Sequence, residues 1–517
     1  MDKEEAGREI LDRIKEDNVD REDINDLKME VCSKYKIKPV SNRFLLSLMD
    51  DISEELKKKL MKRPTRTISG ITPVAVITKP DKCSHGTCIY CPKGKGFPQS
   101  YSGKEPAIMR GNALDYNSYR QVRRRLEQLK TSGHVTDKVE LIVMGGTFTS
   151  KEMDYQKEFI KGCFDGLNNY KAKNLEESLR KNETSDNRCV GLTIETRPDE
   201  VSENMIRKIL EYGTTRVEIG VQIPDNEIYK KINRGHNVQD VVGSTRRLKD
   251  SGLKVLYHYM PGLPGSNIEK DFKYFKELFE NEKYRPDMLK IYPTLVMKGT
   301  ELEKMYENGN YFPYTDPELI DLLCRMKEIV PKYVRIMHLN RDFPSEEVVA
   351  GCRKNNLRQL VRQEMERKNK ECGCIRCREI GHAKKRKKLK DLNPDMEVMK
   401  YNASGGKEYF ISFEDESEDV LFGFIRLRIP EDPFMKELNR EIGLIRELHI
   451  YGSEIRIGNE SDSAQHRGYG KRLLKKAERI AEREGMDKIA ITSGVGVREY
   501  YRKFGYKLVG PYMIKVF

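Results

Sequence analysis

The 517-residue chain is too long for a single hydrophobic core and should divide into roughly two to four domains. Hydrophobic residues make up 37% of it and charged residues 34%, and no apolar run reaches roughly 18 residues, so a transmembrane helix is excluded. The start of the chain lacks the apolar stretch of a signal peptide, which predicts a cytoplasmic protein, and the formal charge of +14 favours a polyanionic partner such as nucleic acid.

Residues 1–68 are predicted to be a helical segment that ends in a run of basic side chains. The run contains Lys57, Lys58, Lys59, Lys62, Arg63 and Arg66. Such a run is usually a solvated helix face. In a chain of this net charge it is also a candidate contact with a polyanion.

Short apolar segments alternate with helix-length segments from residue 69 to about 335. Strands are predicted at residues 71–77, 139–144, 191–195, 216–221, 253–260 and 288–292. Strands that alternate with helices favour a parallel sheet with crossover helices. We therefore expect an α/β domain over residues 69–335 that forms a barrel or a partial barrel.

Three cysteines lie on a loop directly after the first of these strands. They are Cys83, Cys88 and Cys91. A [4Fe-4S] cluster held by three thiolates keeps one iron free, and that iron can bind the amino and carboxylate groups of S-adenosylmethionine (SAM). The loop position and the aromatic residue before the last cysteine favour this cluster, typical of the radical SAM superfamily, over a zinc knuckle completed by His85. The Gly145-Gly146 pair after the second strand suits the turn that receives SAM there, although a plain strand-ending turn looks similar.

A second cysteine cluster lies between the predicted barrel and the end of the chain. It consists of Cys372, Cys374 and Cys377. Three thiolates and the imidazole of His382 would close a tetrahedral zinc site, and His338 and Cys352 are other candidate fourth ligands. Unliganded thiols are the alternative. We predict a linker over residues 336–390 that holds this zinc site and ends in a basic run at residues 384–390.

Residues 391–517 show a different pattern. Strands are predicted at residues 409–413, 421–427 and 447–452, then a glycine turn, a helix over 471–484, and strands at 489–492 and 507–510. Gln465, Gly468 and Gly470 lie in the turn, whose backbone N–H groups suit a pyrophosphate at a helix N-terminus. With residues 447–450 upstream and Tyr500-Tyr501 downstream, the segment resembles the N-acetyltransferase (GNAT) superfamily. There the upstream strand splays to bind the pantetheine arm of CoA, and a tyrosine protonates the CoA thiolate, although each tyrosine alone would also suit a helix core.

Taken together, these motifs resemble, over nearly the whole chain, the family of Elongator catalytic subunits, the tRNA uridine(34) acetyltransferases. The matching segments include CSHGTCIYCPKG at 83–94, DKVELIVMGGTF at 137–148, ETRPD at 195–199, MPGLPG at 260–265, QHRGYGKRLL at 465–474 and VREYYRKFGYKLVGPYM at 497–513. The loop reads CPKG from Cys91 where the family often has CPGG, so that turn is expected to differ locally.

The resemblance implies a reaction at C5 of the wobble uridine (U34) of a tRNA. A 5′-deoxyadenosyl radical from SAM abstracts hydrogen from the methyl group of acetyl-CoA, the carbon radical adds to C5, and thioester hydrolysis leaves 5-carboxymethyluridine. By resemblance, Cys83, Cys88 and Cys91 hold the cluster, and Glu195, Arg197 and Gln222 lie in the SAM pocket. The acetyl-CoA contacts implied are Lys138, Glu447, Leu448, His449, Ile450, Tyr469, Gly470, Lys471 and Tyr501. The basic N-terminal segment and residues 384–390 are candidate tRNA contacts.

The expected architecture is a helical N-terminal segment, a partial (β/α) radical SAM barrel, a zinc-stabilised junction and a mixed α/β GNAT domain. Its bound groups would be a [4Fe-4S] cluster, SAM, acetyl-CoA and zinc. The GNAT pattern alone also permits a protein lysine acetyltransferase with a structural iron–sulfur domain, and the charge alone permits a tRNA-binding scaffold without activity. The sequence leaves open which tRNAs are used and whether the chain acts alone, as a homodimer or with partner subunits.

Overall fold

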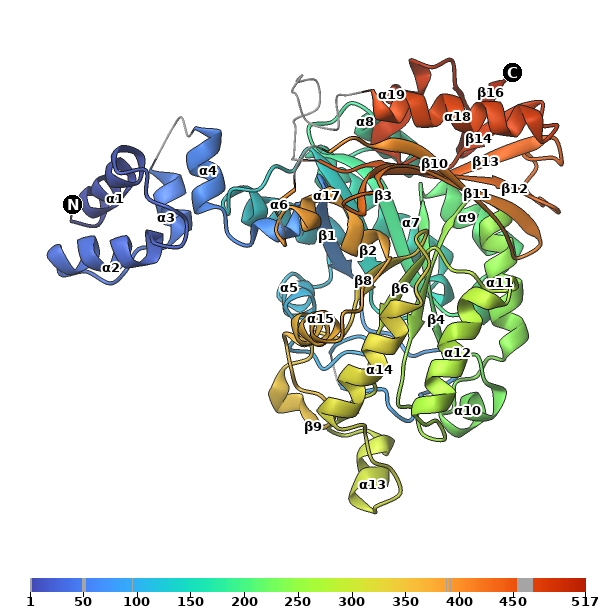
Figure 1. Ribbon diagram of the computed structural model, residues 1–517, viewed down its shortest axis with the longest axis horizontal. Coiled ribbons are helices and arrows are strands. Elements are labelled where there is room, and N and C mark those ends of the chain that lie inside the picture. The colour runs from blue at the N-terminus through green and yellow to red at the C-terminus, as the bar shows by residue number, and fades with distance from the viewer. Residues whose placement is uncertain (1, 49–52, 95, 387, 390–391, 453–467) are drawn as a thin grey trace.

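Helices form the N-terminal part of the chain and project from the body of the molecule (Figure 1). The computed structural model describes residues 2–48, 53–94, 96–386, 388–389, 392–452 and 468–517. The helices are α1 (Asp2–Glu16), α2 (Ile24–Lys34), α3 (Asn42–Ser47) and α4 (Glu54–Leu60). They enclose a small core of their own around Ile10, Val31 and Leu45, separate from the main core. The predicted helical segment is therefore present as a compact bundle.

Seven parallel strands form an open partial barrel at the centre of the molecule, with neighbours in the order β1-β2-β3-β4-β5-β6-β8. The strands are β1 (Thr72–Ile77), β2 (Lys138–Met144), β3 (Arg188–Thr196), β4 (Arg216–Gln222), β5 (Lys254–Tyr259), β6 (Met288–Ile291) and β8 (Arg335–His338). All six strands predicted over residues 69–335 are confirmed. The last strand, β8, was not predicted, and it continues past residue 335, where the barrel domain was expected to end.

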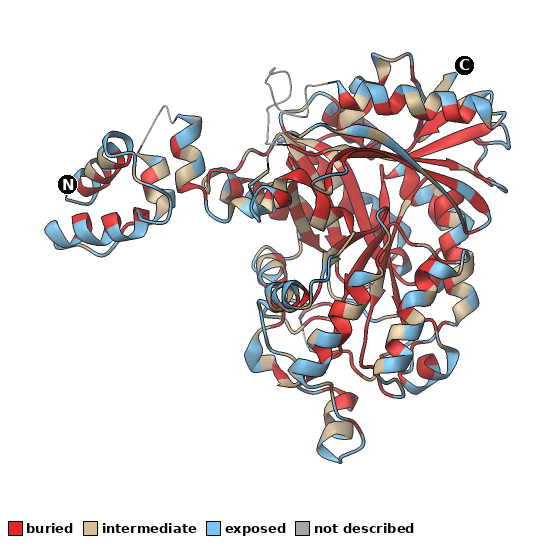
Figure 2. Ribbon diagram, in the orientation of Figure 1, coloured by how far each residue is buried: buried red, intermediate tan, exposed pale blue. Residues whose placement is uncertain are grey.

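Helices cover the outside of this sheet, and their apolar faces supply its outer core (Figure 2). The helices of this part of the chain are α5 (Pro106–Asn112), α6 (Ser118–Lys130), α7 (Met153–Asn168), α8 (Leu175–Asn182), α9 (Glu203–Glu211), α10 (Asn226–Lys231), α11 (Val238–Asp250), α12 (Ile268–Glu280), α14 (Asp316–Glu328), α15 (Leu357–Arg367) and α16 (Ile375–Arg378). Two more helices lie elsewhere: α13 (Glu301–Glu307) projects away from the sheet, and α17 (Ile380–Ala383) contacts β12 (Val420–Ile429) of the C-terminal domain. A short pair, β7 (Val296–Met297) and β9 (Val348–Ala350), lies apart from the sheet. Among these described helices, none is long and apolar enough to cross a membrane.

The interior of the barrel is covered at its central strands and accessible along its free edge. Every residue of β4 is buried, as expected for a central parallel strand covered on both faces. In β2, buried residues alternate with partly exposed ones, so Lys138, Glu140, Ile142 and Met144 form a half-open column along one face. The barrel interior is therefore reached along β1 and β2, at the free edge of the sheet.

A second seven-stranded sheet forms the C-terminal domain, in the order β10-β11-β12-β13-β14-β16-β15. Its elements are β10 (Asp395–Ala403), β11 (Gly406–Asp415), β12 (Val420–Ile429), β13 (Ile442–Ile450), α18 (Tyr469–Arg483), β14 (Lys488–Ile491), α19 (Arg498–Arg502), β15 (Lys507–Val509) and β16 (Tyr512–Val516). The predicted helix and strands are present, but β13 starts five residues before the predicted 447. The edge strand β10 and the last strand β16 were missed.

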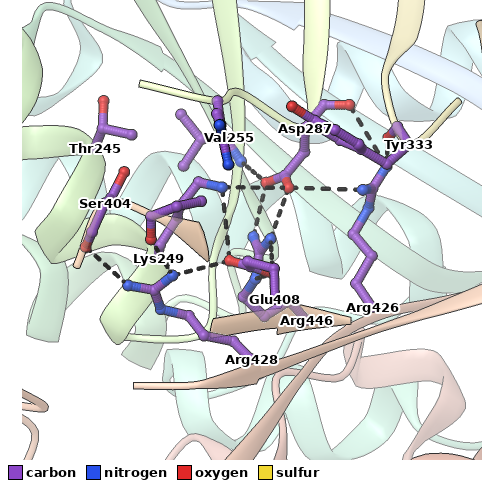
Figure 3. A network of polar contacts seen from close by, with 12 residues as sticks. Thr245, Lys249, Val255, Asp287, Tyr333, Ser404, Glu408, Arg426, Arg428 and Arg446 are labelled. Carbon is purple, nitrogen blue, oxygen red and sulfur yellow. Dashed lines mark hydrogen bonds and ion pairs between the residues drawn. The ribbon is translucent and has the colours of Figure 1, made fainter. Parts of the chain in front are cut away.

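The C-terminal domain closes the end of the barrel where the strands begin, through a buried network of charges (Figure 3). Asp287, just before β6, accepts two hydrogen bonds from Arg446 of β13, at 2.6 and 2.7 Å. Arg446 also contacts Glu408 of β11, at 2.8 Å, and Glu408 lies 3.0 Å from Arg428 of β12. Lys249 of α11 completes the group, 3.6 Å from Glu408 and 3.8 Å from Asp287. These charges fix the two domains to one another, because a carboxylate from each domain is satisfied by the same arginine.

Candidate active site

The first cysteine cluster lies on the loop after β1, at the end of the barrel where the strands finish. Gln99 anchors this loop: its side-chain oxygen accepts from the Cys83 amide at 3.0 Å, and its nitrogen donates to the Gly86 carbonyl at 3.1 Å. From the other side, Asn233 donates to the Thr87 carbonyl at 2.8 Å. The loop is therefore held in place by side chains remote in sequence, which pattern analysis of the loop did not identify.

Positively charged and polar groups surround the sulfur atoms of this loop. Arg234 lies 3.6 Å from the Cys88 sulfur and is itself fixed by the Gly220 carbonyl at 2.5 Å. Burial raises the pKa of Cys91 to about 12, and burial likewise raises the pKa of Cys83, partly opposed by a hydrogen bond from Thr147. Thiols in such a dry site need a metal centre to hold them as thiolates.

The spacing of the three sulfur atoms distinguishes between the two metal centres considered for this loop. The ligand atoms of Cys83, Cys88 and Cys91 do not all lie within 4.8 Å of one another, and His85 completes no such set with them. Thiolates on one tetrahedral zinc, with bonds of about 2.3 Å, lie only about 3.8 Å apart. A cluster in which each thiolate binds a different iron accommodates the wider spacing, so the residues fit a [4Fe-4S] cluster better than zinc.

The three cysteines face a cavity of about 600 Å³ at the ends of the barrel strands. Gly146, Glu195, Arg197 and Gln222 also line it, so most of the predicted SAM-pocket residues come together there. Gly145 adopts a φ of 123°, and a side chain at this position would meet the Thr78 hydroxyl at 2.3 Å, so the turn requires glycine. Gly145 thus fixes the turn, and Gly146 beside it lines the cavity.

Among the buried polar atoms of this cavity that lack a hydrogen-bond partner, two belong to predicted SAM-pocket residues. They belong to Arg197, whose other two nitrogens bind Asp199 at 2.9 and 2.5 Å, and to Gln222, whose side-chain oxygen is unsatisfied. Burying such groups unpaired is costly unless a ligand completes them. A free guanidinium N–H and an amide oxygen fit the carboxylate and hydroxyl groups of SAM. Glu195 differs, because it is already engaged by the Tyr101 hydroxyl at 3.1 Å and by Lys290 at 3.7 Å.

A charged cluster deeper in the barrel was missed by the sequence analysis. The Lys290 ammonium contacts Glu218 directly, and His258 lies 2.9 Å from the same carboxylate. Although burial opposes ionisation, Lys290 and His258 hold the pKa of Glu218 well below its usual range. Glu195, Glu218 and His258 are close enough to share a metal ion. The cation that Glu218 binds directly is the ammonium of Lys290. These residues are distinguished only because their side chains point into the barrel from β4, β5 and β6. The sequence alone does not show which side of each strand faces inward.

The second cysteine cluster has the tighter spacing expected of a single metal ion. The sulfur atoms of Cys372, Cys374 and Cys377 all lie within 4.8 Å of one another. Hydrogen bonds from the other two thiols hold the pKa of Cys374 well below its ordinary value. Among the residues described, no fourth His, Cys, Asp or Glu joins this set, and the predicted candidate His382 lies 3.1 Å from Glu379 instead. The spacing of the three sulfurs fits zinc, and in this structure none of the predicted fourth ligands His382, His338 and Cys352 joins them.

In the C-terminal domain, β13 separates from its neighbour part of the way along its length. It pairs in parallel with β14 only from Ile442 to Ile445, but continues along β12 to Ile450. Beyond Ile445, β13 is no longer paired with β14, and a separation of these two strands is what was expected at an acyl-CoA site. A side chain on Gly470 would lie 2.9 Å from the Tyr500 hydroxyl and 3.7 Å from Ile450, so β13, α18 and α19 converge at one point.

The remaining predicted acyl-CoA residues divide into those near this point and those engaged elsewhere. Tyr469 is buried at the start of α18 against Phe413, and Lys471, two residues further on, is exposed. Glu447 is bound by Arg426 at 2.8 Å and by Lys254 at 3.9 Å, so its carboxylate belongs to the domain junction. Gly468 adopts a φ of 72° with open space around it, whereas Gln465 lies outside the described residues, as do Lys387 and Lys390 of the basic run.

His449 and Lys138 face the boundary between the two domains. The His449 ring lies 3.3 Å from the Ser69 carbonyl and stacks on Tyr451, and burial lowers its pKa. Lys138 starts β2, and its register partner Arg188 packs directly against Gly496 of the C-terminal domain. Lys138 thus lies at the amino-terminal end of the half-open column on β2. Met144, at the carboxyl-terminal end of the column, lines the cysteine cavity. It lies about 20 Å from Lys138 at the rise of an extended strand.

The two tyrosines predicted as proton donors lie on α19. Tyr501 is almost fully buried against Tyr500 and Tyr506, and burial raises its pKa. Tyr500 is partly exposed, its hydroxyl lies over Gly470, and burial raises its pKa also. Both phenols are therefore protonated at neutral pH, as a general acid must be.

Family models match four consecutive parts of the chain. They are the ELP3 N-terminal domain at residues 3–68, the radical SAM superfamily at 77–278, the radical SAM C-terminal domain at 286–367 and the acetyltransferase (GNAT) family at 377–506. The order agrees with that of the helical bundle, the barrel and the C-terminal sheet.

Similar proteins cover nearly the whole chain. A tRNA uridine(34) acetyltransferase from Methanocaldococcus infernus is 48% identical over 99% of both chains. Another from Dehalococcoides mccartyi is 50% identical over 88% of this chain and 99% of its own. The human Elongator complex protein 3 is 40% identical over 96% of this chain and 93% of its own. The solved structure of the M. infernus Elp3 lacking its N-terminus matches with a TM-score of 0.78 and 47% identity, over 87% of this chain and all of that one.

Proposed function

The chain belongs to the family of Elp3-type enzymes that join a radical SAM domain to a GNAT domain, and from this we propose that it converts the wobble uridine of tRNA to 5-carboxymethyluridine. One observation carries the proposal. The cavity with the three-cysteine loop lies at the carboxyl ends of the barrel strands, and the GNAT domain, whose β13 parts from β14 after Ile445, closes the other end of the same barrel.

At the carboxyl ends of the barrel strands, Cys83, Cys88 and Cys91 would hold the [4Fe-4S] cluster. SAM bound there supplies a 5′-deoxyadenosyl radical. The unsatisfied guanidinium nitrogen of Arg197 would bind the carboxylate of SAM, and the side-chain oxygen of Gln222 would accept from a hydroxyl group. Lys290, held by Glu218, provides a fixed positive charge on the cavity wall.

At the other end of the barrel, the backbone of residues 447–450 would bind the pantetheine arm of acetyl-CoA, and the N-terminus of α18 its pyrophosphate. Lys138 lies where the column meets the GNAT domain, and Tyr501 would protonate the CoA thiolate. Bond formation at the ring carbon C5 needs a carbon radical rather than an electrophilic acetyl group. A radical site and an acyl-CoA site in one chain therefore act on one substrate.

We further propose that zinc at Cys372, Cys374 and Cys377 stabilises the segment between the barrel and the GNAT domain, and that the protein acts in the cytoplasm. The spacing of the sulfurs supports the metal, because all three lie within 4.8 Å of one another. The two basic segments proposed to contact tRNA also lie close together in space. Burial and the Arg21 charge both lower the pKa of Lys385, and Arg21 donates to the Lys58 carbonyl at 3.1 Å.

Anaerobic reconstitution tests the proposed function. The iron-loaded protein, incubated with bulk tRNA, SAM and acetyl-CoA, should form 5′-deoxyadenosine and 5-carboxymethyluridine, detected by mass analysis of the nucleosides. Absence of both products would contradict the proposal. Acetylation of lysine peptides at a rate that tRNA does not change would instead support a protein acetyltransferase.

Replacing Tyr501 by Phe should lower kcat for tRNA-dependent release of CoA by about a hundredfold, the usual effect of losing a general acid. The matched variant Tyr500→Phe should chiefly raise KM for acetyl-CoA, because its hydroxyl lies over Gly470 at the start of α18. Free thiol released in the steady state measures both. An unchanged kcat in Tyr501→Phe would remove this tyrosine from the reaction.

Replacing Cys374 by Ala should remove close to one equivalent of zinc from the purified protein, measured by elemental analysis, and leave the iron content unchanged. Loss of a structural zinc ligand destabilises the fold around it. Cys324→Ala, which removes a buried thiol of α14 that belongs to neither cluster, is the matched control. Equal zinc contents in both variants would refute a metal at this site.

A further inference from the structure

Four arginines line one wall of the cavity that holds the three-cysteine loop. Arg63 and Arg66 come from the connector between the helical bundle and β1, where Pro64–Arg66 forms a short 3-10 helix. Arg110 comes from α5 and Arg125 from α6. Three separate segments thus bring their guanidinium groups to the free edge of β1, where the barrel interior opens.

Among the residues that the structure describes, no carboxylate forms an ion pair with any of these four arginines. Arg110 donates to the Ala75 carbonyl of the edge strand at 2.7 Å, and its Nε is buried without a partner. The two acidic residues nearest to it along the chain lie against other groups: Glu105 accepts from the Ser102 amide at 2.9 Å, and Asp115 lies 3.7 Å from Arg120. Partly buried cations are ordinarily paired, so this group lacks the anion that would balance it.

The four charges also repel one another. Burial and then the charges of Arg66 and Arg110 lower the pKa of Arg125 to about 10. Burial and then Arg66 lower the pKa of Arg110, and burial and then Arg63 lower that of Arg66. An anion that enters the cluster relieves this repulsion, and so binds more strongly than at a single arginine.

The segment that carries Arg63 and Arg66 is fixed before any ligand binds. The His134 ring lies 3.1 Å from the Thr67 hydroxyl and 2.9 Å from the Lys62 carbonyl, which ties both ends of the segment to the barrel domain. His134 and Thr67 are both buried. A site arranged in advance loses less side-chain entropy on binding, and the planar guanidinium of arginine can donate two parallel hydrogen bonds to a pair of phosphate oxygens.

We propose that Arg63, Arg66, Arg110 and Arg125 form a phosphodiester-binding site that holds the tRNA backbone next to the uridine while its base enters the cavity. This assignment rests on the proposed function. The phosphates of CoA offer the same chemistry, but the acyl-CoA groups converge at Gly470, Ile450 and Tyr500 in the other domain. The arginines instead continue the basic surface of α4 and the connector, which includes Lys57, Lys58 and Lys62.

The test is the salt dependence of tRNA binding by the double variant Arg110→Gln/Arg125→Gln in the full-length, cluster-loaded protein. Removing one arginine–phosphate interaction should reduce the slope of log Kd against log salt by about 1, so the double variant should reduce it by about 2. Binding at moderate salt should weaken by at least about tenfold. The control Arg120→Gln/Arg124→Gln removes two other arginines of α6, which do not line the cavity. It should change the slope by less than half as much as the double variant.

Affinity for acetyl-CoA, measured on the same preparations, separates the two sources of phosphate. We expect it to stay within roughly twofold of the wild type, as for sites far apart. A loss of acetyl-CoA binding with tRNA binding unchanged would assign the cluster to CoA and overturn the proposal, and equal slopes in the two double variants would overturn it as well. Absence of tRNA binding by the wild-type protein would contradict the proposed function itself, and with it the arginine site.

Discussion

Replacing Cys88 by Ala is expected to reduce formation of 5′-deoxyadenosine and of modified uridine to background, with loss of iron from the anaerobically reconstituted protein. Cys88 lies at the centre of the loop, between Arg234 and His85, at 3.6 and 3.3 Å from its sulfur. Two remaining thiolates cannot hold a cluster that leaves a single iron free. Iron content, the visible absorption of the cluster and nucleoside mass analysis measure the result.

The acyl-CoA site provides an internal control for this variant, because it is formed by the other domain. Affinity for acetyl-CoA should stay within roughly twofold, as expected for distant sites. Cys324→Ala, which removes a thiol from the same domain outside the cavity, should keep full activity. A Cys88→Ala protein that still modified tRNA at the wild-type rate would show that the iron–sulfur domain is only a scaffold.

Replacing Asp287 by Ala is expected to lower the free energy of unfolding by about 3–5 kcal/mol, the range found when a buried ion pair loses one partner. The two hydrogen bonds from Arg446 disappear, and the charges of Arg446, Lys249 and Arg426 stay buried with less compensation. The Asp287 carboxylate also accepts from the Val255 amide at 2.9 Å, so β5 is held less firmly at the junction. Urea unfolding measures the change.

The pH dependence of this effect follows from the pKa of Asp287. Although burial opposes ionisation, Arg446 and Lys249 hold this pKa far below its ordinary value. The stability that a lowered carboxyl pKa contributes is complete above the unfolded value of about 4 and is lost as the pH falls below it. The difference between wild type and variant should therefore shrink below about pH 4. Glu269→Ala, which breaks an exposed pair with Arg325, should cost only about 0–1 kcal/mol. A loss that small for Asp287→Ala would refute the account of the junction.

Strands of the barrel were predictable because short segments rich in apolar and β-branched residues alternate with helix-length segments. The segments at residues 139–144 and 216–221, which lie in β2 and β4, are examples. The edge strand β10 was missed because most of its residues are exposed or only partly buried, so its polar sequence is typical of a loop. The strand β8 has four residues and too short a run to be distinguished.

The local parts of the site were predictable, and its long-range parts were not. Cys83, Cys88 and Cys91 are identified by spacing on one loop, and Gly145 by its place after a strand. Gln99 and Arg234, which position that loop, reach it from elsewhere in the chain, and no local spacing marks them. Arg426, Arg428 and Arg446 have the charge typical of a solvent-exposed strand face, yet all three are buried against the barrel domain.

Reaction with acetyl-CoA deuterated at its methyl group tests most directly whether the two cofactor sites serve one reaction. We expect 5′-deoxyadenosine to acquire deuterium only when tRNA is present, and the carboxymethyl group on U34 to keep the remaining deuterium. The two labelled products should form in equal amounts. Unlabelled 5′-deoxyadenosine, together with an acetyl group that retains all its deuterium on tRNA or lysine, would contradict this expectation. The GNAT domain would then transfer acetyl groups independently of the radical site.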